Sequence, residues 1–172
     1  PALEQPTAKP TMTESPAPEL PTAEPTAEPA TPKSPTAEPP ASGAVFPCRL
    51  VISKIGVDAP VVEGDTDEDL KKGIGHRIGT ANPGEPGNMV VSAHDDIHGE
   101  IFRYLVKLKA GDEVLIHTNR GTFRYVVSKV EILLPTNVEV LDPTDHSVLT
   151  MITCYPYMVD THRVVVRAEL AE

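Results

Sequence analysis

Short runs of apolar residues, broken by polar and turn-forming residues, recur along residues 44–172 and predict β-strands. The runs are rich in Val, Ile, Leu and Thr, and they lie at residues 48–64, 89–93, 112–118, 122–134, 147–154 and 163–170. Gly56 and Asp58 divide the first of them into two strands. The turn "NRG" (119–121) separates two runs at the spacing of a β-hairpin. The pattern therefore predicts seven or eight strands.

Two stretches have the features of short helices. In "DTDEDLKKG" (65–73), Thr66 or Asp67 can cap a helical turn, acidic residues crowd its start, and two lysines lie near its end. In "EIFRYLVKL" (100–108), the apolar residues stand at helical spacing. Between them, "GIGHRIGTANPGEPGN" (73–88) carries glycines and prolines that predict an irregular loop.

The order of these elements bears on the fold class. Helices are missing between most of the predicted strands, which argues against a parallel βαβ architecture. We therefore expect an all-β fold, a closed or nearly closed antiparallel β-barrel with the short helices as lids.

Residues 1–43 have a different composition from the rest of the chain. They hold 12 of the 19 prolines and no aromatic residue, and they repeat the motif "PTAEP". Such a segment cannot bury enough apolar surface to offset the entropy lost on ordering. We expect a disordered linker or stalk of extended polyproline geometry, followed by one domain at 44–172. Because the chain begins at Pro1 rather than Met, we expect that a removed upstream segment was a membrane anchor.

Charge and cysteine count narrow the possible partners. The net charge is −10, of which −4 falls on residues 1–43, and this acidic balance argues against nucleic acid as a partner. No apolar run is long enough to span a membrane. Two cysteines allow a disulfide between Cys48 and Cys154, although such a bond would remove the Cys154 thiol from any chemistry.

Cys154 stands at the end of a predicted strand rather than inside it, because Tyr155 and Pro156 break the strand after it. A thiol in this place is either a small core residue or a nucleophile, and a nucleophile needs a proton donor and an oxyanion donor nearby. Of the six histidines, His94 is best placed as the acid, because it also ends an apolar strand and strand ends cluster at one rim of a barrel. Arg163 begins the last strand after a short loop and can donate several hydrogen bonds to an oxyanion.

Two patterns resemble metal sites but fit them poorly. His94 and His98 stand four residues apart, and Cys154 would add a sulfur ligand for zinc, but "HDDIHG" contains a glycine and follows a strand, so the imidazoles need not share a face. The acidic residues of 63–73 lack the spacing of an EF-hand loop and suit a solvated helix start. We expect no metal and no cofactor.

Taken together, these residues give the chain a resemblance to the sortases, the cysteine transpeptidases of bacterial surfaces. The resemblance covers nearly all of residues 48–170 and rests on four stretches: "LVISKIGVDAPVVEG", "GIGHRIGTANPGEPGNMVVSAHDD", "IFRYLVKLKAGDEV" and "LTMITCYP…HRVVVRAEL". Its most specific part is the final Thr-Cys pair with an arginine nine residues after the cysteine. This short step is similar to that of the class D and class E sortases.

The resemblance implies a closed eight-stranded β-barrel, with Cys154 as the nucleophile, His94 as the general acid and base, and Arg163 as the oxyanion or substrate clamp. Thr153 matches the threonine before the family's cysteine, which lies at the groove for the sorting signal. The implied reaction cleaves an LPXTG-like sorting signal after its Thr and transfers the acyl group to an amine acceptor, such as a peptidoglycan cross-bridge or a pilin lysine. The implied location is the extracellular face of the cell membrane, with an N-terminal anchor. A secreted cysteine peptidase and a non-catalytic peptide-binding β-barrel remain alternatives.

Three positions depart from the pattern of the family. Sortases of this type usually have proline at the position of Ser53 and glycine at that of Ala93, and they often have arginine where this chain has Asp95. A carboxylate beside His94 favours the charged imidazolium. An unperturbed thiol, with a pKa of about 8.5, is roughly 3% thiolate at pH 7. We therefore expect the reactive pair of thiolate and imidazolium to be a minority at neutral pH.

Overall fold

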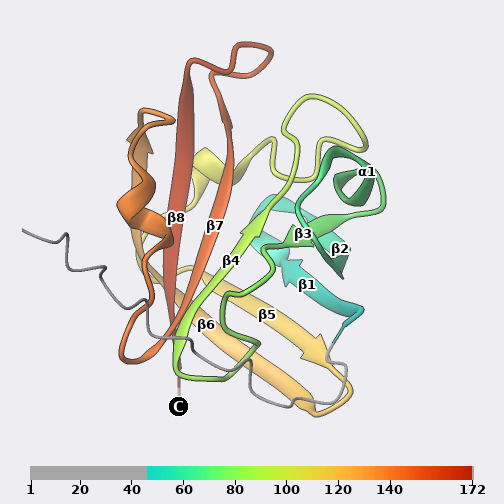
Figure 1. The fold of residues 1–172 in the computed structure, drawn as a ribbon, viewed down its shortest axis with the longest axis vertical. Coiled ribbons are helices and arrows are strands. Elements are labelled where there is room, and N and C mark those ends of the chain that lie inside the picture. Colours follow the sequence, from blue (N-terminus) through green and yellow to red (C-terminus); the bar gives the residue numbers. More distant parts are fainter. Residues whose placement is uncertain (1–45, 172) are drawn as a thin grey trace, which may run out of the picture. The chain divides into compact units, whose positions relative to one another are not determined.

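The computed structural model of this chain describes residues 46–171 (Figure 1). The predicted disordered stalk at residues 1–43 and the predicted domain boundary at residue 44 lie outside the described residues, and both stay predictions. Within the described part, no helix has the length and apolar character needed to cross a lipid bilayer.

Eight strands form the described domain: β1 (Cys48–Ile52), β2 (Val57–Glu63), β3 (Ile74–His76), β4 (Gly87–Ser92), β5 (Glu113–Thr118), β6 (Gly121–Leu133), β7 (Ser147–Tyr155) and β8 (His162–Leu170). They close into a barrel in the order β1-β2-β3-β4-β7-β8-β6-β5 (Figure 1). The remaining elements are short: α1 (Asp67–Leu70) and the 3₁₀ turns η1 (Ser53–Ile55), η2 (Leu105–Lys107) and η3 (Val138–Leu141). The predicted all-β class and closed eight-stranded barrel are confirmed.

The prediction of purely antiparallel pairing is wrong. Among the strands described, β2 pairs with β3 and β4 pairs with β7 in parallel. Parallel neighbours need a long connection that returns the chain to the same end of the sheet. The segment around α1 supplies this return between β2 and β3, and the β5–β6 hairpin lies within the return between β4 and β7.

Two local predictions also need correction. Residues 74–76, predicted as loop, form β3, which is held between β2 and β4. Residues 100–108, predicted as a helix, form a series of turns that ends in η2, and most of their backbone hydrogen bonds run from the donor to the carbonyl three residues earlier. The predicted helical turn after Thr66 is confirmed as α1, and the side chain of Thr66 accepts the capping bond from the Asp69 amide.

Alternation along the strands separates a core face from a solvent face. Along β1, for example, Leu50 and Ile52 are fully buried, whereas Arg49 is exposed. The segment that follows β4 adds Phe102 and Leu105, both fully buried, to the same core. This segment begins immediately after His94, so burial of its apolar residues fixes the chain on that side of the candidate site.

Candidate active site

The three predicted chemical residues form one row: Cys154 and Arg163 lie on neighbouring strands, and His94 lies just beyond the end of a third. Cys154 on β7 pairs directly with Arg163 on β8. On the other side of β7, the parallel register with β4 pairs Ser92 with Ile152, so His94, two residues further on, comes level with Cys154. Neighbouring strands stand about 4.8 Å apart, which places the three residues side by side.

The same three residues also share a face of the sheet. Alternate residues of β7 and β8, such as Met151 and Val166, point into the core. Cys154 and Arg163 have the opposite parity and point outward, and each is half-buried. His94 has the outward parity of β4 and is half-buried too. The row therefore projects from the outer surface of the barrel at the end of its strands.

Thr153 does not belong to this outward row. It is buried at 5% exposure, and its hydroxyl donates a hydrogen bond of 2.8 Å to the carbonyl oxygen of Ala93. The amide of Ala93 in turn donates to the carbonyl of Ile152 at 3.3 Å. These bonds extend the β4–β7 register by one residue and hold the backbone in front of His94. A direct contact of Thr153 with a substrate stays a prediction.

Arg163 is anchored by the loop between β7 and β8. One terminal nitrogen of its guanidinium donates to the carbonyl oxygens of Asp160, at 2.9 Å, and His162, at 2.8 Å. Because a guanidinium carries five N–H donors, these two bonds leave others for a ligand. The β7–β8 loop therefore helps to set where the positive charge lies.

Burial and nearby charges act on the Cys154 thiol. Partial burial raises its pKa above the ordinary value, and the Arg163 guanidinium opposes this rise. The carboxylates of Asp95, Asp160 and Asp96 raise the pKa further, because they disfavour a second negative charge. Thiolate is therefore scarce at neutral pH, in the direction expected from the sequence.

Asp95 is itself a buried carboxyl group. It is 4% exposed, and burial raises its pKa, opposed in part by the charges of His94 and Arg163. Its negative charge is thus less favourable than that of an exposed aspartate.

We expect Asp160→Asn to make Cys154 more reactive. The substitution removes a negative charge that raises the thiol pKa, while the backbone carbonyl that holds Arg163 remains. The rate of alkylation by iodoacetamide at pH 7 should rise by about two-fold. The difference should shrink in 1 M salt, where the Debye length is about 3 Å. Equal rates for the variant and the parent at low salt would contradict this prediction, and Cys154→Ala gives the background rate.

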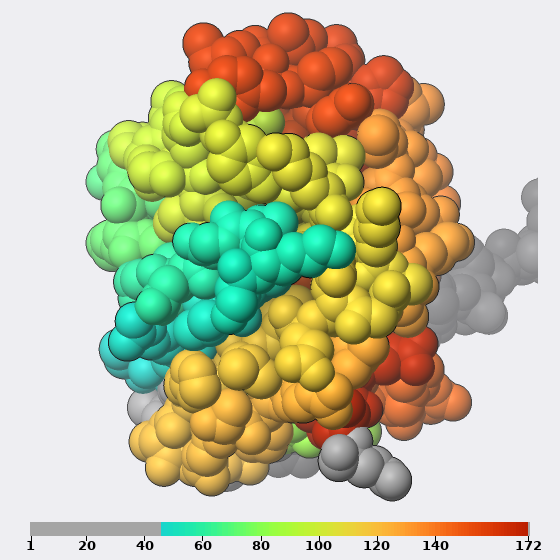
Figure 2. All heavy atoms as spheres, turned by 180° about the vertical axis from the view of Figure 1, so that it is seen from behind, coloured from blue at the N-terminus to red at the C-terminus, as the bar shows by residue number. Residues whose placement is uncertain are grey.

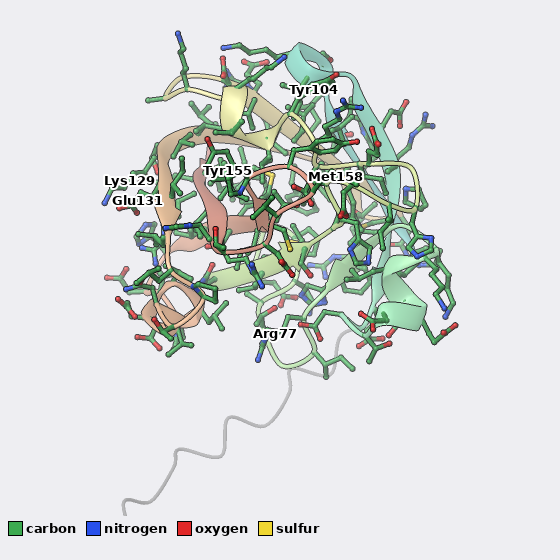
Figure 3. All side chains as sticks on the ribbon, turned by 90° about the horizontal axis from the view of Figure 1, so that it is seen from above. Arg77, Tyr104, Lys129, Glu131, Tyr155 and Met158 are labelled. Atoms are coloured by element: carbon green, nitrogen blue, oxygen red, sulfur yellow. The ribbon has the colours of Figure 1, made fainter. Side chains whose placement is uncertain are left out.

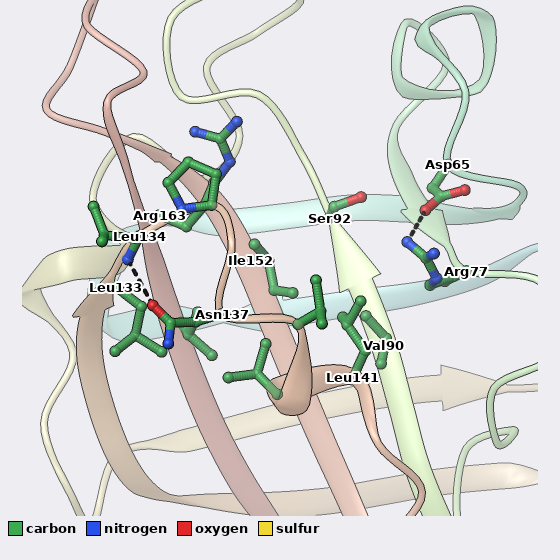
Figure 4. Close-up of a pocket in the computed structure, with 14 residues that line it drawn as sticks. Asp65, Arg77, Val90, Ser92, Leu133, Leu134, Asn137, Leu141, Ile152 and Arg163 are labelled. Atoms are coloured by element: carbon green, nitrogen blue, oxygen red, sulfur yellow. Dashed lines mark hydrogen bonds and ion pairs between the residues drawn. The ribbon is translucent and has the colours of Figure 1, made fainter. Parts of the chain in front are cut away.

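A groove of about 180 Å³ lies beside the row, on the same outer face (Figure 4). Its floor is formed by outward residues of the strands, including Val90, Ser92 and Ile152. Figure 4 shows one wall at Leu134 and Arg163 and the opposite wall at the ion pair of Asp65 and Arg77, which are 3.3 Å apart. Most of the other lining is apolar and comes from the connection between β6 and β7, which includes η3.

The wall that the β6–β7 connection contributes was not predicted from the sequence. This wall is held by Asn88, whose side-chain amide donates to the carbonyls of Val140 and Asp142, both at 3.0 Å. Thr150 donates to the Asn88 oxygen at 2.6 Å and completes the anchor. A polar residue in an otherwise apolar strand was the available signal, because buried amides in such positions normally bond to a distant backbone segment.

The other histidines lie outside the row. His76, predicted in a loop, is buried at 3% in β3, and burial lowers its pKa. The His98 ring is exposed, and its centroid lies 5.5 Å from that of His94. The other three pair with neighbouring side chains: His117 with Thr122, His146 with Asp145, and His162 with Thr161. Within the described residues, no group of three or more His, Cys, Asp or Glu side chains is placed to hold a metal ion.

Cys48 and Cys154 are both free thiols in the described structure, so the disulfide that the cysteine count allowed is not formed. Cys48 is the first residue of β1 and is 5% exposed. Burial raises its pKa to about 12, so it stays protonated at neutral pH. Cys48 is therefore an inert core residue.

We expect Cys48→Ser to leave the alkylation rate of Cys154 unchanged and to lower the free energy of unfolding by about 1–3 kcal/mol, because it buries a hydroxyl among apolar side chains. Denaturant titration measures the second effect. A loss of Cys154 reactivity in a variant that is still folded would contradict the assignment of Cys48 to the core.

Most of the described residues match known proteins. The sortase domain family model matches residues 50–171. Sortase D of Bacillus subtilis is 33% identical over 109 residues, which cover 63% of this chain and 54% of that protein. Sortase SrtE1 of Streptomyces coelicolor is 32% identical over 139 residues, which cover 72% of this chain and 40% of that protein. The matched part thus spans about half the length of these curated relatives.

Solved structures resemble the fold closely. A pilus-related sortase C of Group B Streptococcus superposes with a TM-score of 0.70 at 34% identity, covering 76% of this chain and 70% of that one. A Clostridium perfringens sortase D5 transpeptidase gives a TM-score of 0.67 at 35% identity, covering 73% of this chain and 78% of that one. The resemblance predicted from the sequence is therefore confirmed.

Proposed function

Because the chain belongs to the sortase family, we propose that it is a cysteine transpeptidase that cleaves an LPXTG-like sorting signal after Thr and passes the acyl group to an amine. The observation that carries this proposal is the row formed by Cys154 on β7, Arg163 on β8 and His94, two residues beyond the end of β4. A nucleophile, a proton donor and an oxyanion donor are the three parts that acyl transfer needs.

In the proposed reaction, the Cys154 thiolate attacks the carbonyl carbon of the substrate threonine. Arg163 donates hydrogen bonds to the oxyanion, and the imidazolium of His94 gives its proton to the departing glycine amine as the C–N bond breaks. A thioester to Cys154 remains, and His94 is now neutral. An incoming amine attacks the thioester, its proton passes to His94, and the new amide bond releases the thiolate.

The groove supports a short extended peptide as the acyl donor. Its largely apolar floor and wall suit an apolar side chain of the peptide. An extended chain advances about 3.3 Å per residue, so this side chain would stand a few residues before the threonine. Arg163 lines both the groove and the row, so a peptide in the groove would bring its carbonyl toward the thiol.

Sortases as a family act at the cell surface on proteins that carry a sorting signal and on amine acceptors. For this chain we propose the extracellular face of the cell membrane as the location, with an N-terminal anchor outside the given residues. A peptidoglycan cross-bridge or a pilin lysine is the proposed acceptor. The thioester must meet an amine rather than water for either acceptor to be joined.

The test is incubation of the chain with Leu-Pro-X-Thr-Gly-like and Leu-Ala-X-Thr-Gly-like peptides, with and without a short amine such as triglycine. Mass spectrometry should find a product cut after Thr and joined to the added amine. Hydrolysis alone at every amine concentration would instead identify a peptidase. A Cys154 that resists mild alkylation, with no product from any peptide, would indicate a non-catalytic peptide-binding barrel.

A further inference from the structure

Two loops extend beyond the row, and three side chains connect them. One loop follows β4 and carries His94, Glu100 and Arg103, and the other joins β7 to β8 and carries Tyr157. The Tyr157 hydroxyl donates to the Glu100 carboxylate at 2.8 Å. Arg103 forms an ion pair with the same carboxylate, and its guanidinium carbon lies 4.4 Å from the centroid of the Tyr157 ring. We call Tyr157, Glu100 and Arg103 the loop latch.

Little else holds these two loops together. Among the backbone hydrogen bonds of residues 46–171, none joins the stretch 94–104 to the stretch 156–161. The β7–β8 loop has one backbone bond within its own turn, from the Val159 amide to the Pro156 carbonyl at 2.7 Å. The contact between the two loops therefore depends on side chains. Figure 2 shows the β7–β8 loop, in red, directly against the yellow-green segment that follows β4.

The backbone beside the latch is held in an unfavourable conformation. Glu100 has a φ of 51° and Met158, next to Tyr157, has a φ of 63°, although neither is glycine. Non-glycine residues keep such angles only where surrounding contacts enforce them, and such residues cluster at functional sites. Figure 3 shows Tyr155, the last residue of β7, and Met158 of the β7–β8 loop over the end of the barrel.

Each loop also carries a part of the row. The Phe102 amide donates to the His94 carbonyl at 3.1 Å, so the Glu100–Arg103 stretch is bonded back to the His94 backbone. In the other loop, the Asp160 carbonyl accepts from Arg163 at 2.9 Å. The latch thus connects the support of His94 to the support of Arg163, on the two sides of Cys154.

We propose that Tyr157 is a positioning residue, which acts with Glu100 and Arg103 to hold His94 and Arg163 in register with Cys154. Its hydroxyl bonds to Glu100, and Tyr157 does not line the groove, so we expect its effect to fall on the rate of acyl transfer and not on peptide binding. The expected change in kcat rests on the proposed function. The expected change in the electrostatic potential at Cys154 can be measured without any peptide.

The decisive variant is Tyr157→Phe, which removes the hydrogen bond to Glu100 and keeps the ring beneath Arg103. Tyr104→Phe is the matched control, because the Tyr104 ring also lies against Arg103, at 5.5 Å, and against Lys107, at 4.0 Å, while the structure gives its hydroxyl no hydrogen bond within the described residues. Both rings are partly exposed, so neither change opens the core.

In the transfer assay, kcat of Tyr157→Phe should fall by about 10-fold with KM within about two-fold, because small displacements of catalytic groups cost rate more than binding. Tyr104→Phe should stay within about two-fold of the parent in both constants. Glu100→Ala combined with Tyr157→Phe should lose no more than Glu100→Ala alone, since the two residues share one contact.

A second readout needs no peptide. Arg163 lowers the Cys154 pKa, whereas Asp95, Asp160 and Asp96 raise it. If Tyr157→Phe displaces Arg163, the pH midpoint of Cys154 alkylation should move upward. In Tyr104→Phe the midpoint should not change. If the parent transfers no peptide, the proposed function fails while this midpoint still tests the latch. An unchanged midpoint in Tyr157→Phe would overturn the inference, as would a change confined to KM.

Discussion

Arg163→Ala is expected to reduce peptide transfer by about 100- to 1,000-fold, the usual cost of losing a positioned oxyanion donor. Arg163 pairs with Cys154 across β7 and β8, and it lines the groove beside the thiol. Arg163→Lys should restore little of this activity, because one ammonium does not reproduce the planar fork of a guanidinium. Turnover of a single peptide, with circular dichroism to verify folding, is the measurement.

Arg167 is the matched control for Arg163. It lies on the same strand and the same outward face, but it pairs with Thr150 rather than with Cys154. Four residues of strand carry it roughly 13 Å from the level of the thiol. Arg167→Ala should therefore stay within a few-fold of the parent. An inactive Arg167→Ala beside an active Arg163→Ala would refute the assignment of the clamp. Arg163→Ala should also slow alkylation of Cys154, since the guanidinium lowers the thiol pKa.

Cys154→Ala should abolish transfer altogether, because no other thiol is available to form the thioester: Cys48 is buried and its pKa is about 12.

His94→Ala should lower turnover by about 100- to 10,000-fold, the range of general acid–base contributions. His98→Ala is the control, since its ring lies 5.5 Å from that of His94 but outside the row. Formation of a thioester by His94→Ala at the parent rate, seen as a mass increase, would show that the histidine is not needed to protonate the leaving amine. Full activity of His94→Ala would exclude it as the proton donor.

The sequence predicted the parts of the site that depend on neighbouring strands and short loops. Cys154 and Arg163 belong to one hairpin, so a loop of few residues already places them together. The strands themselves were visible because one face of each is buried, which leaves a period of two in the sequence. The position of His94 beside Cys154 was harder to foresee, since it depends on a parallel pairing between β4 and β7, and two other strands, β5 and β6, lie between them along the chain.

The elements that the sequence did not predict owe their form to distant contacts. β3 has three residues and is a strand because β2 and β4 pair with it on both sides. The predicted helix at 100–108 has its buried residues Phe102, Leu105 and Leu108 spaced by three, a period that suits 3₁₀ turns as well as a helix. The groove wall from the β6–β7 connection depends on Asn88, which is 52 residues from Val140 along the chain, and no local pattern reports such a contact.

Because β4 and β7 pair in parallel, the connection between them tolerates changes of length that the strands themselves do not. The connection between these strands can gain or lose residues, in the β5–β6 turn for example, without moving His94 relative to Cys154. Within β4 or β7, by contrast, a single inserted residue would turn the reactive side chain into the core, and two would shift it about 6.6 Å along the strand. Homologous chains can therefore differ freely in the number of residues between histidine and cysteine, while the parity of each residue within its own strand is fixed.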